Sequence, residues 1–352
     1  MRIGLIGTGR IGAFHAATLV GLPAVGSLVV HDTDERSARA VADRTGAEVA
    51  GDLDGLFGAG LDGVVIASST ATHADLILAA GRAGLPTFCE KPVAGGLAET
   101  DAVLAALAGS DVPLHVGFQR RFDAGHRELR EAVASGRLGW THTLRACTAD
   151  PTPPPPSYVS GSGGIFRDCS VHDYDAVRWV TGREVVEVYA TGANRGEDFF
   201  AAADDVDTGV SVLTLDDGTL AVCTATRYNG AGYDVRLEVC GSKGSLVAGL
   251  TERTPLVPAG GPARDTGTPY PGFMERFRDA YRAELAAFTE VVAGLRTSPC
   301  TGRDARAALA VAEAATRSRA TGRPVRVVPA GTAGRPGGSP GEDSRTVRGP
   351  GK

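Results

Sequence analysis

The segment GGIFRDCSVHDYD, residues 163–175, places one imidazole, His172, between two carboxylates, Asp168 and Asp175. In a helix, spacings of four and three residues would bring these side chains to one face. Histidine titrates near neutrality and is suited to accept the proton that an alcohol loses on oxidation. A solvated polar stripe would have the same spacing, so this segment needs support from the rest of the chain.

Lysine usage provides a second candidate for such chemistry. Of the 36 lysines and arginines, only Lys91, Lys243 and Lys352 are lysines, and Lys91 stands in CEKP directly after a strand-like run. The pKa of an ammonium can be tuned, whereas a guanidinium stays protonated. An ammonium can also stabilise a developing alkoxide. We therefore expect Lys91 to join the 163–175 segment in one site.

In the oxidation of an alcohol, each of these residues is expected to have a different role. His172 is expected to act as the general base, and Lys91 to stabilise the alkoxide. Asp168 is expected to hydrogen-bond the substrate hydroxyl or to orient the imidazole, and Asp175 to bind a further hydroxyl. Asp173 falls on another side of the helix and is expected to cap it or to form an ion pair.

The N-terminal residues contain a candidate cofactor site. RIGLIGTGRIGAFHAATLV carries Gly7-x-Gly9-x-x-Gly12 between a strand pattern and a helix pattern, and SLVVHD ends a second strand pattern at Asp32. This combination predicts a dinucleotide site, in which glycines and a helix N-terminus receive the pyrophosphate and the carboxylate receives the ribose. A glycine-rich turn of another α/β fold is the alternative. The carboxylate favours NAD over NADP, although nearby Arg36 could bind a 2′-phosphate.

Further cofactor contacts are expected where the other strands end, because parallel α/β sheets bind ligands at that edge. One such loop is SSTATH, whose hydroxyls would serve equally well as helix caps. The candidate cofactor-binding residues are Gly7, Thr8, Gly9, Arg10, Ile11, Gly12, Asp32, Arg36, Ser68, Ser69, His73, Glu90, Lys91 and Gln119.

Periodicity predicts an α/β chain of two domains. Strand and helix patterns alternate through residues 1–120, which predicts a Rossmann domain with a doubly wound parallel sheet. Residues 121–328 predict a second α/β domain with a large, open, mainly antiparallel sheet, because consecutive strand patterns are joined by hairpin turns. The proline-rich run that precedes the 163–175 segment is expected to be an ordered part of the site, and residues 329–352 a disordered tail.

Composition limits the classes of binding partner and the cellular compartment that we expect. The net charge is −5 without a basic stripe, so small molecules or other protein chains are expected as partners, and not nucleic acid. We find no signal-peptide pattern, and no apolar run approaches the roughly 20 residues that span a bilayer. The cytoplasm is therefore expected, with the scattered cysteines as reduced, mostly buried thiols and no metal site.

With GTGRIG, EKP, GFQRRFD and GGIFRDCSVHDYD identified, residues 1–328 resemble the Gfo/Idh/MocA oxidoreductases, and DPTPPPPSYVSGSGGIFRD and AGYDVRLEVCGSKGSL resemble inositol 2-dehydrogenases within that family. The resemblance implies a homo-oligomer, a tetramer or a dimer, built through the open sheet. It implies catalytic roles for Lys91, Asp168 and His172, and a peptide bond before Pro92 that is often cis. The candidate substrate-binding residues become Arg121, Asp150, Asp168, His172 and Asp175.

The chain departs from the common family pattern at CTADP, SSTATH and Cys169, which leaves the exact polyol open. The leading hypothesis is NAD-dependent oxidation of a cyclic polyol such as myo-inositol. The same chemistry on a pyranose sugar or sugar derivative is the alternative. A third hypothesis is an NAD-binding regulator without turnover, against which the presence of Lys91, Asp168 and His172 argues. A metal-dependent alcohol dehydrogenase lacks a convincing third ligand.

Overall fold

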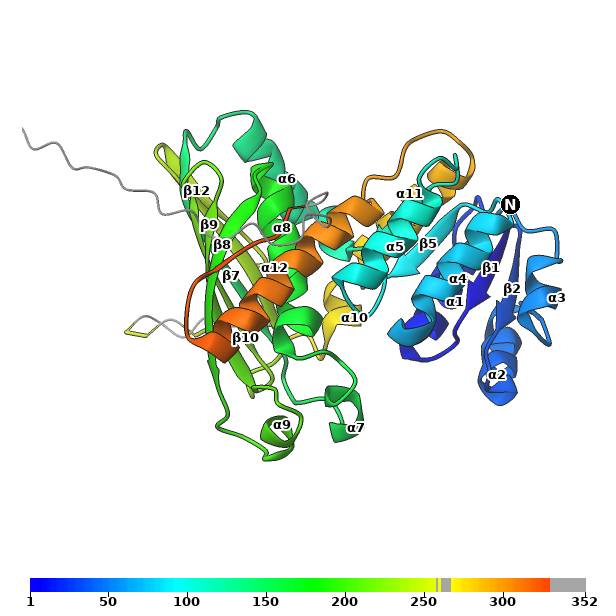
Figure 1. Ribbon diagram of the computed structural model, residues 1–352, viewed down its shortest axis with the longest axis horizontal. Coiled ribbons are helices and arrows are strands. Elements are labelled where there is room, and N and C mark those ends of the chain that lie inside the picture. Colours follow the sequence, from blue (N-terminus) through cyan, green and yellow to red (C-terminus); the bar gives the residue numbers. More distant parts are fainter. Residues whose placement is uncertain (258, 261–266, 330–352) are drawn as a thin grey trace, which may run out of the picture.

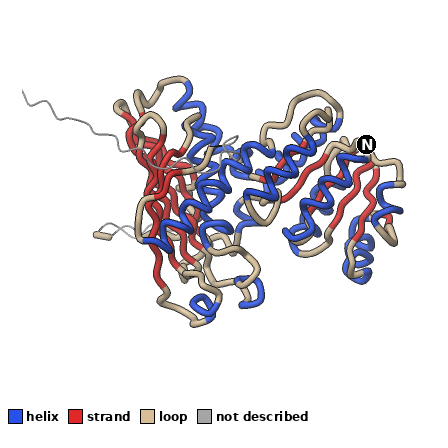
Figure 2. Tube along the Cα trace, in the orientation of Figure 1, coloured by secondary structure: helices blue, strands red, loops and turns tan. Residues whose placement is uncertain are grey.

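The computed structural model describes residues 1–257, 259–260 and 267–329. These residues form two sheets in two lobes, which Figure 1 shows at the two ends of the long axis, with helices between them. Strands and helices occupy each lobe, as Figure 2 shows in the same orientation. The expected α/β class with a parallel and a mainly antiparallel sheet is confirmed.

The first sheet is entirely parallel, with the order β3-β2-β1-β4-β5-β6. Its strands are β1 (Arg2–Ile6), β2 (Ser27–His31), β3 (Glu48–Val49), β4 (Gly63–Ile66), β5 (Thr87–Glu90) and β6 (Leu114–Gly117). The helices between them are α1 (Arg10–Val20), α2 (Glu35–Thr45), α3 (Leu53–Phe57), α4 (Thr70–Arg82) and α5 (Leu97–Leu107). The order reverses at β1 and β4, and in such sheets ligands bind at this switch point.

The second sheet has the order β12-β11-β7-β10-β9-β8-β13, in which only the β7–β10 pair is parallel. Its strands are β7 (Thr141–Ala149), β8 (Val185–Ala193), β9 (Thr208–Leu215), β10 (Leu220–Thr226), β11 (Asp234–Gly241), β12 (Gly244–Ala248) and β13 (Val325–Arg326). Strands β9 and β10 form a hairpin, as do β11 and β12, and both were predicted from their turns.

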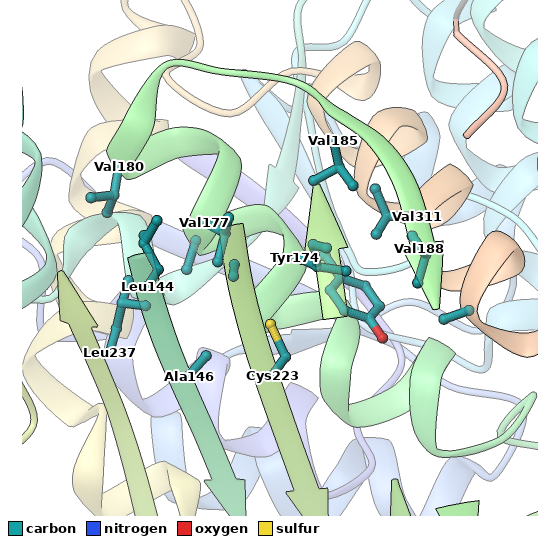
Figure 3. Packing of buried hydrophobic residues seen from close by; sticks show 14 of the residues in the cluster. Leu144, Ala146, Tyr174, Val177, Val180, Val185, Val188, Cys223, Leu237 and Val311 are labelled. Atoms are coloured by element: carbon teal, nitrogen blue, oxygen red, sulfur yellow. The ribbon is translucent and has the colours of Figure 1, made fainter. Parts of the chain in front are cut away.

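Helices cover one face of the second sheet. The remaining helices are η1 (Gln119–Phe122), α6 (Ala124–Ala134), α7 (Pro156–Val159), η2 (Phe166–Ser170), α8 (Val171–Thr181), α9 (Phe199–Ala202), α10 (Phe273–Arg276), α11 (Arg278–Val292) and α12 (Gly302–Thr321). In the core, Tyr174, Val177 and Val180 of α8 point toward the sheet, and Val311 of α12 lies beside Val188 of β8 (Figure 3). These residues, three apart along α8, therefore form its buried face.

The opposite face of the second sheet carries exposed apolar side chains. Cross-strand pairing places Tyr189, Val212 and Val222 in one row, since Val212 is opposite both of the others. The row continues through the Arg145–Glu238 ion pair (2.7 Å) to Val247 of β12. Tyr189, Val212 and Val247 are all exposed. This row is called the open-face row below.

Several predictions about elements need correction. The strand expected over residues 113–122 ends at Gly117 and is followed by the 3-10 helix η1. The long helix expected from residue 273 is broken at Phe277 into α10 and α11. Leu285 and Phe288 of α11 pack into the core of the first sheet, although the predicted second domain contains them.

The expected tail of residues 329–352 lies outside the described residues from position 330 onward. All six cysteines are free thiols, and all except Cys147 are buried. Among the described residues, no helix is both long and apolar enough to cross a membrane.

Candidate active site

The glycine loop after β1 has the geometry of a dinucleotide cradle. Gly7 adopts a φ of +92°, which favours glycine. A Cβ on Gly12 would lie 1.9 Å from the carbonyl oxygen of Gly7, so close packing of α1 requires glycine there. At Gly9, in contrast, no described atom lies within 4 Å of a Cβ position. The outer side of the loop is therefore open beside the first turn of α1, whose N–H groups can receive a phosphate.

Asp32 stands directly after β2 and is held by the same loop. Its Oδ2 accepts hydrogen bonds from the backbone N–H and the hydroxyl of Thr8, at 2.6 and 3.0 Å, and its Oδ1 from the backbone N–H of Asp34. Burial raises the pKa of Asp32, but the backbone N–H groups of Thr8 and Asp34 outweigh it and leave the pKa below its ordinary value. Asp32 is therefore an ionised acceptor with lone pairs left for a ribose.

The remaining cofactor candidates differ in their surroundings. Ser69 is the N-cap residue of α4, although its side chain makes no capping hydrogen bond, and the Ser68 hydroxyl lies 2.7 Å from that of Thr72. The Arg36 side chain is 94% exposed and lies 3.6 Å from Asp34. Gln119 is buried at the start of η1, after β6. The loop residues Arg10 and Ile11 form the first turn of α1.

Two of these candidates are already engaged by the protein. The His73 ring is 1% exposed, and its nitrogens lie 2.7 Å from the Pro92 carbonyl and 3.2 Å from the Ser68 carbonyl. Glu90 lies 2.6 Å from the buried ring of His15 on α1. His73 thus joins the β4–α4 turn to the turn after β5, where the Lys91–Pro92 peptide bond is cis. Both side chains therefore have hydrogen-bond partners within the protein.

Lys91 and Asp168 meet where the two lobes face each other. Lys91 follows β5, and its Nζ donates to the carbonyl oxygen and to Oδ1 of Asp168, at 3.0 and 3.1 Å. Burial lowers the pKa of Lys91, but the Asp168 carboxylate more than offsets it and the pKa lies above its ordinary value. Burial likewise raises the pKa of Asp168, and Lys91 and Arg227 bring it below its ordinary value. The two groups therefore form a charged pair.

His172 belongs to the same electrostatic cluster. Asp168 lies in η2, a π-helical turn, and His172 lies in the first turn of α8. The Nδ1 atom of His172 is buried and has no hydrogen-bond partner among the described residues. Burial, followed by the positive charges of Lys91 and Arg120, lowers the pKa of His172 well below its ordinary value. A neutral imidazole beside an ammonium and a carboxylate has the composition of a proton-transfer site.

Two predicted substrate residues pair with each other. Arg121 grips both oxygens of Asp175, at 2.8 and 2.6 Å, and also bonds to Asp304 and the Pro299 carbonyl. The expected free carboxylate at Asp175 is therefore engaged within the protein. Asp173 forms the expected ion pair, at 2.5 Å from Arg120.

Tyr158 and Arg227 complete the cluster, and sequence reasoning did not select either of them. Tyr158 lies on α7 in the proline-rich run, and its hydroxyl donates to Oδ1 of Asp168 at 2.9 Å. Burial and Asp168 raise the pKa of Tyr158 to about 12. Arg227 follows β10 and bridges Oδ2 of Asp168, at 2.7 Å, and Oδ2 of Asp150, at 3.0 Å. The proline-rich run was the signal for Tyr158, whereas only its place after a strand pointed to Arg227.

Known proteins resemble this chain over almost its whole length. Residues 1–118 match the model of the oxidoreductase family with an NAD-binding Rossmann fold, and residues 126–247 match that of the GFO/IDH/MocA C-terminal domain. The chain is 38% identical to myo-inositol 2-dehydrogenase of Thermotoga maritima over 330 residues, covering 93% of this chain and 98% of that protein.

Solved structures share the fold as well. A myo-inositol dehydrogenase from Corynebacterium glutamicum superposes with a TM-score of 0.86 at 36% identity, covering 94% of this chain and 99% of that one. A scyllo-inositol dehydrogenase from Lactobacillus casei, with bound NAD(H) and scyllo-inositol, gives a TM-score of 0.85 at 29% identity, covering 93% and 99%.

Proposed function

We propose that this chain, which belongs to the GFO/IDH/MocA family of NAD-dependent oxidoreductases, oxidises a hydroxyl of an inositol to the ketone. Membership rests on both family models and on relatives such as the Thermotoga maritima enzyme. The observation that carries the proposal is the cluster of Lys91, Asp168 and His172 between the dinucleotide loop and the second sheet. Relatives named for both myo-inositol and scyllo-inositol support a cyclic polyol as the substrate.

The cofactor fits the first sheet. Gly7, Thr8, Gly9, Arg10, Ile11 and Gly12 would hold the pyrophosphate, and Asp32 would hold the adenosine ribose. The loop after β4, with Ser68 and Ser69, and the turns at Lys91 and Gln119 would line the nicotinamide end, since all lie at the carboxyl edge of the sheet. When bound, NAD supplies the ring carbon that accepts a hydride.

The protein side chains then accept the proton of the substrate hydroxyl and stabilise the charge left on its oxygen. His172 accepts the proton of the substrate hydroxyl, because its lowered pKa keeps the imidazole neutral. The Lys91 ammonium faces the oxygen on which negative charge develops, and Asp168 holds that ammonium in place. Asp150 uses Oδ2 for Arg227, and its Oδ1 would accept a further substrate hydroxyl.

A direct assay tests the proposal. The purified protein is incubated with NAD and, in separate reactions, with myo-inositol, scyllo-inositol, glucose, galactose and xylose, and NADH is followed by absorbance. We expect turnover of an inositol and much weaker turnover with NADP. Turnover of a pyranose alone would replace the inositol with a sugar as substrate. If no polyol gave NADH, while calorimetry confirmed NAD binding, the regulator hypothesis would be favoured.

Substitution of Asp32 tests the ribose role. In Asp32→Ala, the preference for NAD over NADP, as the ratio of kcat/KM values, is expected to fall about 10- to 100-fold, because a hydrogen bond to a charged group contributes about 1.5–3 kcal/mol. Asp43→Ala, which removes an exposed carboxylate from α2, is the matched control. An unchanged ratio in Asp32→Ala would remove Asp32 from the ribose site.

The open-face row supports a homo-oligomer built through the second sheet. It presents Tyr189, Val212 and Val247 with an ion pair between them, a pattern suited to a self-complementary interface. Sedimentation analysis of the purified chain measures the assembly directly. A monomer at micromolar concentration would contradict this interface.

A further inference from the structure

Arg227 is anchored at the junction of two parallel strands. Ala149 at the end of β7 is opposite Thr226 at the end of β10, and the backbone N–H of Asp150 donates to the Thr226 carbonyl at 2.9 Å. Asp150 and Arg227 therefore leave the sheet side by side. The Arg227 side chain is 4% exposed, and its backbone N–H donates to the Asp207 carbonyl.

The guanidinium of Arg227 divides its donors between two carboxylates. Nη2 donates to Oδ2 of Asp168 at 2.7 Å, and Nη1 donates to Oδ2 of Asp150 at 3.0 Å. The other oxygen of Asp168 binds Lys91 and Tyr158. Both oxygens of Asp168 thus have fixed partners, and the carboxylate cannot rotate without breaking bonds on both sides.

The contacts of Asp168 define what it can do. Among the described residues, no hydrogen bond joins Asp168 to His172, so the structure gives Asp168 the role of holding the Lys91 ammonium. The charges balance, because two carboxylates, Asp150 and Asp168, meet two cations, Lys91 and Arg227. Without Arg227, Asp168 would keep Lys91 as its only cationic partner, and the partly buried Asp150 would lose its ion pair.

We propose that Arg227 is a positioning residue of the active site, which acts through Asp168 to fix the Lys91 ammonium where negative charge develops on the substrate. The proposal rests on the proposed function for its catalytic consequence and on the Asp150–Arg227–Asp168–Lys91 chain for its geometry. A lysine at position 227 could not reproduce it fully, because one ammonium lacks the planar fork that reaches two carboxylates at once.

The expected pH effect follows from the groups around Asp168. Burial disfavours its ionised form, and Arg227 is one of the two cations that oppose burial. Loss of Arg227 therefore raises the pKa at which Asp168 takes a proton and releases Lys91. The groups that face Asp168 are Lys91 after β5, Asp150 after β7, Tyr158 on α7, Cys169 within η2, His172 on α8 and Arg227 after β10.

The three lysines of the chain make a test possible that does not depend on turnover. Protein labelled with ¹⁵N-lysine has only three side-chain ammonium groups, and the Lys91 signal is assigned by its loss in Lys91→Met. At acid pH the Lys91 signal should show an inflection where Asp168 takes up a proton. In Arg227→Gln, this inflection is expected to move up by about 1–3 pH units relative to wild type, the range by which a neighbouring arginine lowers an aspartate pKa. An unmoved inflection would overturn the proposal.

Kinetics provide the second arm. In Arg227→Gln, kcat is expected to fall about 100-fold, the size of effect that misplacement of a catalytic group by about 1 Å can produce. The KM for NAD should stay unchanged. Arg137→Gln, which breaks the exposed Arg137–Glu128 ion pair, is the matched control and should behave as wild type.

The variants distinguish positioning from folding and from the proposed function. If Arg227→Gln does not fold, Arg227→Lys decides, with an expected intermediate shift of the Lys91 signal and an intermediate fall in kcat. A folded Arg227→Lys with wild-type values for both would overturn the proposal. A wild-type protein that turns over no polyol would contradict the proposed function, whereas the Lys91 signal would still decide the role of Arg227.

Discussion

Lys91→Met is expected to lower kcat for inositol oxidation by about 1000-fold, the upper range for removal of one donor to a developing oxyanion. Affinity for NAD, measured by calorimetry, should remain close to that of wild type. Methionine has a similar length but no charge, so the site keeps its shape and loses the ammonium. The comparison therefore isolates the electrostatic contribution of Lys91.

The reason for this large effect is the place of Lys91 in the structure. Its Nζ lies 3.0 and 3.1 Å from two oxygens of Asp168 in a buried site, and charge interactions are stronger there than in water. Because the pKa of Lys91 is raised, the ammonium persists at neutral pH. Its effect on the alkoxide is specific to the transition state and should appear in kcat rather than in KM.

Lys243→Met is the matched control, since Lys243 is exposed in the turn between β11 and β12. It should retain wild-type kcat, pH profile and stability. Lys91→Arg tests geometry, because the charge remains but the guanidinium is larger and planar. Near-native turnover in Lys91→Met, with intact NAD binding, would remove Lys91 from the catalytic machinery.

The cofactor half of the molecule was predictable from local patterns. Gly7, Gly12 and Asp32 identified the first two strands and the helix between them. The backbone requires glycine at both glycine positions, because Gly7 has a positive φ and a Cβ on Gly12 would clash with the Gly7 carbonyl. Lys91 was found by composition, as one of three lysines in an arginine-rich chain. These signals are local or statistical and need no knowledge of tertiary contacts.

The ion pairs within the second lobe were not predictable in this way. Arg121 and Asp175 are 54 positions apart, and Arg227 and Asp168 are 59 apart. Which cation meets which carboxylate depends on strand order and on the π-helical turn of η2, and neither is visible in residue periodicity. The one-face argument for the 163–175 segment therefore selected the candidates His172 and Asp168, but it did not foresee that Asp175 is bound by Arg121.

The pH dependence expected of the enzyme follows from His172. Its pKa is lowered below the ordinary 6.5 by burial first and then by Lys91 and Arg120. A base must be unprotonated to act, so the acid limb of kcat/KM for oxidation should lie below pH 6.5. Reduction of the ketone needs the imidazolium instead, and its rate should therefore rise as the pH falls toward that lowered pKa.

His172→Ala is expected to lower kcat for oxidation by about 10²- to 10⁴-fold, the usual contribution of a positioned general base. The acid limb assigned to His172 should disappear from the remaining activity, and added imidazole should restore part of it, because the side-chain space can admit a small base. His142→Ala, which removes an exposed histidine of β7, is the matched control. If His172→Ala retained both kcat and the acid limb, the base would have to be sought elsewhere, and Tyr158, which is hydrogen-bonded to Asp168, would become the first group to test.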